Sequence, residues 1–374
     1  MGQTLGEPIT TKETASCANS YYKVGSSAMQ GWRVNMEDAH THLLALPDDA
    51  KAAFFAVYDG HGFSGSRVSQ YAGLHLHKRI VNNSFYAEGK IREALEKGFL
   101  DLDEQMLADG DTKEDMSGTT AIVVLIKDDI VYCSNVGDSR AIASIVGKEH
   151  PLSYDHKPGN DDEAKRIVEA GGWVEFNRVN GNLALSRALG DFAFKRNENK
   201  SAKEQIVTAF PDVTTCDVNK DLEFIVLACD GIWDVMSNQE VIDFCRTRLV
   251  NGMEPEKVCE ELLDRCLAPD CELSGLGCDN MTVILVCMLQ NDSPDEYLQR
   301  LARPAPVEVQ ENNSEQVELK TDTATATPET PELFSTPSQS PTIAHEISDD
   351  EKPPSEFKVL VDDSKSKKEE SKDE

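Results

Sequence analysis

Residues 53–65 read AFFAVYDGHGFSG, and the rest of the chain is best understood from this stretch. Its first six residues are apolar and rich in strand-forming side chains, so they predict a buried β-strand. The strand stops at Asp59, and Gly60, His61 and Gly62 follow directly. A single aspartate at the end of a strand is most often a turn residue or a helix cap. If other strands also end in an aspartate, a shared functional site becomes a better explanation for Asp59 than a turn or a helix cap.

Other apolar runs of the chain also meet an aspartate at their ends. EFIVLACDGIWD places Asp230 after a strand, GCDNMTVILV places Asp279 before one, and YCSNVGDSRAIA places Asp138 at a turn between two. If these ends share one edge of a sheet, their carboxylates converge and repel one another. Divalent cations remove that conflict, and oxygen ligands beside glycine suit Mg²⁺ or Mn²⁺ better than zinc. A carboxylate that bridges two ions ~3.5–4 Å apart would form a binuclear centre that makes hydroxide from water.

The remaining pattern mixes strands and helices. Short β-branched runs at 53–59, 119–127, 129–136, 223–230 and 281–289 predict well-buried strands. Amphipathic stretches at 90–107, 161–172, 238–249 and 254–267 predict helices. The strands are too unevenly spaced for a regular βαβ repeat, and glycine-rich nucleotide-binding motifs are missing from the sequence. The fold class indicated is α+β.

Charge and composition exclude several classes of protein. The 374 residues carry a net charge of −30, which opposes nucleic-acid binding because a phosphate backbone would be repelled. No apolar run approaches the ~20 residues of a membrane-spanning helix, and we expect no signal peptide. Gly2 invites N-myristoylation, but Gly6 stands where the motif asks for serine or threonine, so acylation is a minor alternative. The ten cysteines lack a C-x-x-C pair, so we expect free thiols and a cytoplasmic or nuclear location.

Composition divides the chain into three parts. We interpret 1–20 as a polar N-terminal arm, 21–290 as the main folded domain and 291–374 as an acidic, proline-rich tail. The tail has 9 of the 16 prolines, and its 21 acidic and 9 basic residues give it a net charge of −12. It cannot bury enough apolar surface to offset its ordering entropy, so we expect it to be disordered. Candidate sites for proline-directed kinases are Ser293, Thr327, Thr330, Thr336 and Ser340, and FKVLVDD at 357–363 is a candidate docking motif, with a plain solvated linker as the alternative.

Seven stretches resemble, in order, the motifs of the metal-dependent (type 2C) serine/threonine protein phosphatases. They are GWRVNMEDAH, FFAVYDGHG, SGTTA, NVGDSRA, NGNLALSRALGD, LACDGIWDVMS and CDNMTVILV, and they cover residues 21–290. DGHG alone would be a weak signal, but the ordered set is specific. The resemblance implies a four-layer α-β-β-α sandwich of two mainly antiparallel sheets with a binuclear metal centre at one end. It also implies a monomer that hydrolyses phosphoserine and phosphothreonine in proteins by attack of metal-activated water.

The resemblance further implies which residues hold the metal ions, two of Mg²⁺ or Mn²⁺ and a third bound weakly. Asp59 resembles the bridging ligand, with the carbonyl of Gly60 on one ion. Asp230 and Asp279 resemble ligands of the other ion. Glu37 and Asp38 match positions that hold metal-bound waters. Asp138 and Asp234 match positions that, together with Asp230, bind the third ion.

Two further residues match positions that act on the phosphate. Arg33 matches the phosphate-binding arginine, and its guanidinium can offer a bidentate fork to phosphate oxygens. His61 matches the general acid for the leaving seryl or threonyl oxygen, and a histidine titrates near neutral pH. An isolated histidine is more often structural, but the position beside Asp59 favours catalysis. Arg187 could bind substrate, although an i,i+4 pair with Asp191 is the structural alternative.

Phe63 departs from the family pattern. The family usually has another glycine directly after the Gly-His-Gly segment, whereas this chain looks as if Phe63 and Ser64 were inserted there. The candidate ligands come before the insertion. We therefore expect a longer loop or first helical turn after Gly62, outside the metal site.

Several rival functions can be weighed against these residues. CEELLDR at 259–265 fits the C-x5-R pattern of cysteine phosphatases, but it lacks a glycine-rich cradle and its spacing is that of a helix face. An aspartyl-phosphate mechanism would need a D-x-D motif that YDGHG does not match. A non-catalytic adaptor with the same fold should have lost metal ligands, yet Asp59, Asp230 and Asp279 are all present. A phosphohydrolase for small molecules remains as an alternative that a substrate comparison would separate.

Overall fold

The computed structural model describes residues 4–47, 49–108, 117–271 and 275–305. Gly2, most of the predicted tail, the docking candidate at 357–363 and the tail phosphorylation candidates from Thr327 to Ser340 lie outside the described residues. Within the described part, no helix has the length and apolarity that crossing a bilayer requires.

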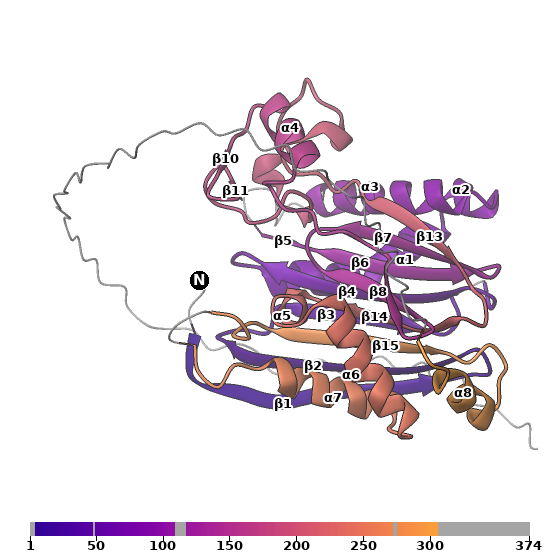
Figure 1. Cartoon of the computed structure of the whole chain (residues 1–374). Helices are drawn as coiled ribbons and strands as arrows, with labels where there is room; N and C mark the ends of the chain where they lie inside the picture. The colour runs from indigo at the N-terminus through magenta and orange to yellow at the C-terminus, as the bar shows by residue number, and fades with distance from the viewer. Residues whose placement is uncertain (1–3, 48, 109–116, 272–274, 306–374) are drawn as a thin grey trace, which may run out of the picture. The chain divides into compact units, whose positions relative to one another are not determined.

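Two antiparallel sheets form the centre of the molecule (Figure 1). The first has six strands in the order β1 (Thr4–Ala18), β2 (Tyr22–Arg33), β15 (Met281–Met288), β14 (Leu222–Ala228), β8 (Arg140–Ile145) and β9 (Lys148–Pro151). The second runs β12 (Leu189–Gly190), β5 (Gly118–Thr119), β4 (Ala53–His61), β6 (Ala121–Lys127), β7 (Ile130–Val136) and β13 (Asp212–Asp217), and β3 (Asp38–Leu43) pairs with β4.

The apolar runs of the sequence become strands that are buried on both faces. Successive side chains of a strand point to opposite faces of the sheet. Phe54 and Phe55 of β4 therefore enter different cores, as do Ile225 and Val226 of β14. Phe55 and Ile225 share the core between the two sheets, while Phe54 and Val226 belong to the two outer cores.

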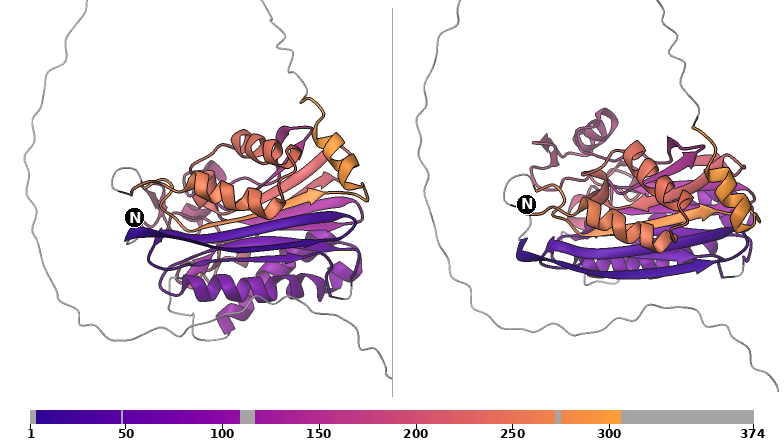
Figure 2. Two further views of the ribbon diagram at one scale, coloured as in Figure 1. Left: turned by 90° about the horizontal axis from the view of Figure 1, so that it is seen from below. Right: turned by 60° about the horizontal axis from the view of Figure 1, so that its bottom comes forward.

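Helices complete the outer layers. α1 (Gly65–Val81) and α3 (Ile91–Ala108), with the short α2 (Ser84–Ala87), lie on the second sheet, and α6 (Asn238–Val250) and α7 (Pro255–Cys266) lie on the first. The turned views in Figure 2 show helices on both sides of the stacked strands. The predicted four-layer α-β-β-α sandwich is confirmed, because three apolar cores separate four layers.

A smaller unit is inserted between β9 and β13. It contains α4 (Asp161–Glu169), β10 (Val174–Glu175), β11 (Arg178–Val179) and the 3-10 helices at 192–194 and 202–204. Its own small core includes Ile167, Val179 and Val207. Figure 1 shows α4, β10 and β11 beyond the edge of the second sheet. This inserted unit supplies part of the cavity described below.

The expected N-terminal arm is wrong for the described residues. Thr4–Ala18 forms β1, which pairs with β2 and makes the edge of the first sheet. Its side chains are mostly exposed, and it contains Gly6 and Pro8, so its sequence lacks the apolar signal of a buried strand. Backbone hydrogen bonds to β2, rather than burial of side chains, therefore stabilise β1 as a strand.

The expected boundary at residue 290 is also wrong. Residues Pro294–Leu301 form α8, and Ser293 begins it as the N-cap of a capping box with Glu296. Tyr297 and Leu301 are buried in the core beneath the first sheet. Proline at the first position of a helix is favourable, so Pro294 starts this element rather than ending the domain.

Cysteine chemistry differs from the expectation in one place. Cys271 and Cys278 form a disulfide, whereas free thiols were expected throughout. Cys259 and Cys266 are buried side chains of α7, so the C-x5-R stretch is a helix face, as its spacing predicted.

Candidate functional site

The predicted site residues gather at one cavity of about 620 Å³. Residues from both sheets and from the inserted unit line it. The candidates among its lining residues are Arg33, Glu37, Asp59, Gly60, His61, Asp138, Asp230 and Asp279. Asp38 is buried next to this lining, whereas Asp234 and Arg187 are not part of it.

The ends of strands bring the carboxylates together. Asp59 lies near the end of β4, and the β3–β4 register places Asp38 directly opposite it. Asp230 begins the short helix α5 (Asp230–Trp233) after β14, and Asp279 precedes β15 by two residues. Asp138 lies in the turn between β7 and β8. Asp59, Asp138, Asp230 and Asp279 were predicted from the apolar runs beside them, and Asp38 only from its family motif. Antiparallel pairing places these residues at one end of the sandwich.

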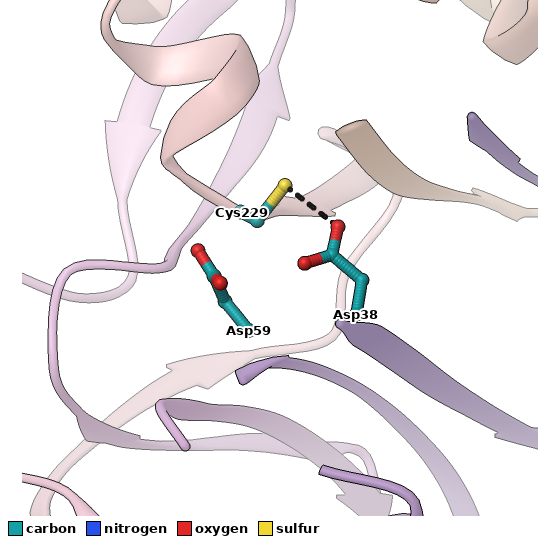
Figure 3. A group of neighbouring side chains, drawn as sticks. All are labelled: Asp38, Asp59 and Cys229. Atoms are coloured by element: carbon teal, nitrogen blue, oxygen red, sulfur yellow. Dashed lines mark hydrogen bonds between the residues drawn. The ribbon is translucent and has the colours of Figure 1, made fainter. Parts of the chain in front are cut away.

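Asp38 and Asp59 face one another beside the thiol of Cys229 (Figure 3). One ligand atom from each of the three lies within 4.8 Å of the others. Cys229 Sγ donates to Asp38 Oδ2 at 3.3 Å, and Thr282 Oγ1 donates to the same oxygen at 2.7 Å. Among the described residues, Oδ1 of Asp38 has no hydrogen-bond partner although it is buried, and the same holds for Oδ1 of Asp230. Two buried carboxylate oxygens are thus left for another partner.

Electrostatics in the cavity disfavour so many negative charges. Burial raises the pKa of Asp59 well above its usual value, and the neighbouring aspartates raise it further. Burial and repulsion from Asp138 do the same to the pKa of Asp230. Burial raises the pKa of Asp38 to about 7, and burial also raises the pKa of Asp234. Lys157 forms an ion pair with Asp138 and offsets only part of this charge. The donor set of buried carboxylates with unpaired oxygens fits divalent cations of the Mg²⁺ and Mn²⁺ class.

Gly60 could not be another residue. A Cβ atom on it would lie 2.4 Å from the carbonyl oxygen of Gly65 and 2.6 Å from that of Glu37. Its own N–H donates to the Glu37 carbonyl at 3.2 Å. The backbone after Asp59 is therefore held against both the start of α1 and the segment that carries Glu37, where its carbonyl could serve as a ligand.

Asn280 organises the segment between β2 and β3, and sequence reasoning missed it. Its side chain accepts from the N–H of Glu37 at 2.9 Å and donates to the carbonyls of Gln30 and Asn35 at 2.8 and 3.0 Å. Three bonds from one amide fix the segment that presents Glu37. An asparagine directly after a candidate ligand, Asp279, was the available signal.

Arg33 lies at the rim of the cluster and forms an ion pair with Asp279. Its Nη2 is 2.5 Å from Asp279 Oδ2, and both side chains are about one-third exposed. The exposed part of the guanidinium can still reach a ligand in the cavity. Arg33 therefore lies beside the carboxylate cluster, next to the candidate ligand Asp279.

His61 is paired with a residue that the sequence analysis assigned elsewhere. Nε2 of His61 lies 2.6 Å from Oδ2 of Asp191, which is fully buried. Burial alone would lower the pKa of His61, but the Asp191 carboxylate outweighs burial and the pKa lies above its usual value. A Cβ atom on Gly118 would come within 2.2 Å of Asp191 and 2.8 Å of His61, so only glycine leaves room for this contact.

Arg187 does not pair with Asp191, which corrects the expected i,i+4 contact. Its guanidinium forms ion pairs with Glu163 of α4 at 2.7 Å and with Asp212 at 2.7 Å. These bonds tie the inserted unit to β13. Arg187 therefore belongs to an internal ion-pair network and does not line the cavity. Its other predicted role, substrate binding, has no support from this position.

Phe63 follows the segment Asp59–Gly62 and lines the cavity. It is 97% exposed and is one of the lining residues. α1 begins two residues later, with Ser64 as its N-cap. Phe63 and Ser64 therefore lie between Gly62 and the first turn of α1, after Asp59 and Gly60, and their interpretation as an insertion relative to the family stays a prediction.

Comparisons with known proteins agree with this geometry. The family described as "Protein phosphatase 2C" matches residues 22–275. A "probable protein phosphatase 2C" of Caenorhabditis elegans is 67% identical over 305 residues, covering 82% of this chain and 85% of its own length. Protein phosphatase 2C homolog 3 of Schizosaccharomyces pombe is 48% identical over 305 residues, covering 81% and 73%. A solved phosphatase from Toxoplasma gondii is similar in structure, with a TM-score of 0.64, 28% identity and coverage of 75% of this chain and 96% of its own.

Proposed function

The chain belongs to the protein phosphatase 2C family, and from this premise we propose that it is a catalytically active, divalent-metal-dependent protein serine/threonine phosphatase. The observation that supports activity most strongly is the convergence of Asp59, Asp230 and Asp279 on one cavity with Arg33 and His61. A non-catalytic adaptor would have no need to keep buried carboxylates that repel one another.

The ligands of the two main ions would be Asp59, Asp230 and Asp279, with the carbonyl of Gly60. Glu37 and Asp38 would hold waters of these ions, and Asp138 with Asp234 would bind a third, weaker ion. When bound, Mg²⁺ or Mn²⁺ would neutralise the carboxylates, draw in the phosphate and activate the attacking water. Support comes from the raised pKa values of Asp59 and Asp230 and from the unpaired oxygens of Asp38 and Asp230, because a cation would relieve both features.

Arg33 would bind the phosphate group of the substrate. Its guanidinium has several N–H donors, and Asp279 occupies one nitrogen. The remaining donors form a planar fork that matches two phosphate oxygens. Asp279 also holds the side chain in place at the edge of the carboxylate cluster, so less conformational freedom is lost when substrate binds.

His61 would donate a proton to the leaving seryl or threonyl oxygen. An alkoxide is a poor leaving group, and protonation during bond cleavage lowers its barrier. Asp191 favours the imidazolium form and engages Nε2, which leaves the N–H at Nδ1 as the donor. The proton would return from solvent after product release.

Metal dependence and substrate class can be tested together with the full chain. Hydrolysis of a phosphothreonine peptide should require Mg²⁺ or Mn²⁺, stop with excess chelator and return when the metal is restored. Asp162→Asn, a change of an exposed residue on α4, provides the matched control for loss of one carboxylate. Activity that persists in chelator would contradict the metal-dependent proposal, and absence of turnover under all conditions would favour a non-catalytic adaptor. Faster hydrolysis of nucleotide or sugar phosphates than of phosphopeptides would favour a small-molecule enzyme.

A further inference from the structure

The lining of the cavity includes apolar residues that the chemistry of phosphate hydrolysis does not use. Besides the charged residues, its lining includes Phe63 and a group of apolar residues from the inserted unit, namely Leu183, Ala184, Leu185 and Phe194. Phosphate, metal ions and water all favour polar surroundings. These side chains must therefore serve either the fold or the rest of the substrate.

Burial separates the two possibilities. Leu185 and Phe194 are buried, and Phe194 belongs to the small core of the inserted unit, so both serve the fold. Phe63 is 97% exposed and adds nothing to a core. A single exposed apolar residue is common on protein surfaces and carries no conclusion by itself. Its position in the lining of the catalytic cavity is the second and independent observation.

The backbone on both sides of Phe63 is held in place. Gly60 is packed against the carbonyls of Glu37 and Gly65, and Gly62 has a positive φ of 87°. The N–H of Ser64 donates to Ser117 Oγ at 2.8 Å, and Ser64 begins α1. The phenyl ring is thus attached to a fixed turn rather than to a loose loop. Because this backbone is already ordered, contact with a ligand restricts only the side-chain torsions of Phe63.

We propose that Phe63 is a specificity-determining residue that selects phosphoprotein segments with a large apolar side chain directly beside the phosphorylated residue. The inference rests on the proposed function. The ring shares one cavity with Arg33 and His61, so it is placed to contact residues of a peptide whose phosphate is bound in that cavity. An apolar neighbour of the phosphorylated residue would remove the ring of Phe63 from water.

A pair of phosphothreonine peptides that differ at one position tests this proposal. One peptide has leucine directly before or after the phosphothreonine, and the other has serine there. The readout is the ratio of their kcat/KM values for the full chain with Mn²⁺. We expect the wild-type protein to prefer the leucine peptide roughly 5- to 20-fold, a modest share of what burial of an aromatic ring can supply. In Phe63→Ala the ratio of the two kcat/KM values should fall to about 1. In Phe63→Leu, which keeps a large apolar side chain, the ratio should stay close to the wild-type value.

Phe176→Ala is the matched control. Phe176 is another phenylalanine, 91% exposed, on the inserted unit but outside the cavity lining, so its loss should leave the ratio unchanged. Because the readout is a ratio within each variant, a general loss of activity cancels. The proposal is overturned if the wild type shows no preference, if Phe63→Ala keeps it or if Phe176→Ala loses it equally.

The test also separates this inference from the proposed function. Metal-dependent turnover with no role for Phe63 would leave the proposed function standing and remove only the inference. If the wild-type protein proves inactive, the proposed function fails. Binding of the same fluorescent peptides, measured by anisotropy, then decides whether Phe63 still selects the leucine peptide.

Discussion

Asp191 is the residue whose role depends most on the folded chain. It has a positive φ of 51°, its side chain is fully buried, and 130 residues separate it from His61 in sequence. Gly118 leaves room for the two side chains to meet. Backbone strain of this kind persists where the surrounding structure holds it and is common at functional sites. Asp191 is therefore best seen as a positioning residue for His61.

We predict that Asp191→Asn lowers the pKa of His61, because the imidazolium loses its negative partner. An acid catalyst must be protonated, so activity falls as pH rises through this pKa, and the alkaline limb of the pH–rate profile should move to lower pH. For alkyl phosphate esters kcat should fall roughly 10- to 100-fold near pH 8. p-Nitrophenyl phosphate should lose less, since its leaving group needs little protonation. Asp162→Asn is the control, and an unmoved alkaline limb would argue against the role of Asp191.

A second residue-scale prediction concerns the metal ligands. Asp59→Asn removes charge from the proposed bridging position and should reduce turnover by more than about 100-fold, with loss of Mn²⁺ binding in calorimetry. Asp138→Asn should retain the two main ions, because Asp138 belongs to the proposed third site. Its activity should fall mainly at low metal concentration. Near-normal turnover of Asp59→Asn would show that the bridge has been assigned to the wrong residue.

A site residue could be predicted from the sequence where the residues next to it in the chain form a recognisable pattern. Asp59, Asp230 and Asp279 adjoin strands that the sequence marks clearly, and a strand end with a carboxylate is visible without any tertiary information. The partners of these residues have no such signal. Asn280 bonds to Glu37 across 243 residues, and Cys229 bonds to Asp38 across 191. Contacts of that kind depend on strand order, which local pattern does not specify.

At the level of elements, the strands with the strongest apolar runs were predicted and the polar ones were not. β4, β6, β14 and β15 are buried on both faces, and their continuous apolar runs follow from that burial. β1 has mostly exposed side chains, and β3 is only partly buried. β1 and β3 are stabilised by pairing with β2 and β4, respectively. The sequence of β1 or β3 alone does not show that such a partner strand lies beside it.

α8 permits a sharp test of where the catalytic domain ends. Tyr297 and Leu301 are buried, and Arg300 Nη1 donates to the carbonyl of Leu222 at 2.9 Å. Truncation after residue 290 should lower the free energy of unfolding by roughly 3–6 kcal/mol, since two large side chains leave the core. Truncation after residue 305 should change it by less than about 1 kcal/mol. Urea unfolding of both variants measures the difference, and equal stability of the two would restore the boundary at 290.

For the whole molecule, stability without metal should depend on the charge of the cavity. The folded-state pKa of Asp38, about 7, lies above its usual value of 3.8. The folded protein therefore binds more protons than the unfolded chain between these values, and this contribution to stability is lost as pH rises through the interval. Buried His40 and His77 have lowered pKa values of about 4 and act in the opposite direction, so the effect has to be isolated with a variant.

We predict that Asp38→Asn stabilises the metal-free protein relative to wild type at about pH 8 and much less at about pH 5, where the wild-type carboxyl is protonated. Thermal unfolding in chelator at both pH values gives the comparison, with Asp162→Asn as the control. Mn²⁺ should stabilise wild type more at the higher pH, because ionised carboxylates bind it better. A difference between Asp38→Asn and wild type that does not change with pH would show that charge in the cavity does not limit stability.

The exposed edge of the first sheet has a consequence for how the protein behaves at high concentration. A long edge strand can recruit the edge of another molecule and begin aggregation. β1 is 15 residues long, but its pairing is interrupted by two register shifts, and it contains Pro8 and the charged Lys12 and Glu13. Lys12 also reaches across to Asp264 of α7. Irregular backbone and charge make this edge a poor template for a second strand, so the polar sequence that obscured the strand also opposes edge-to-edge pairing between copies of the chain.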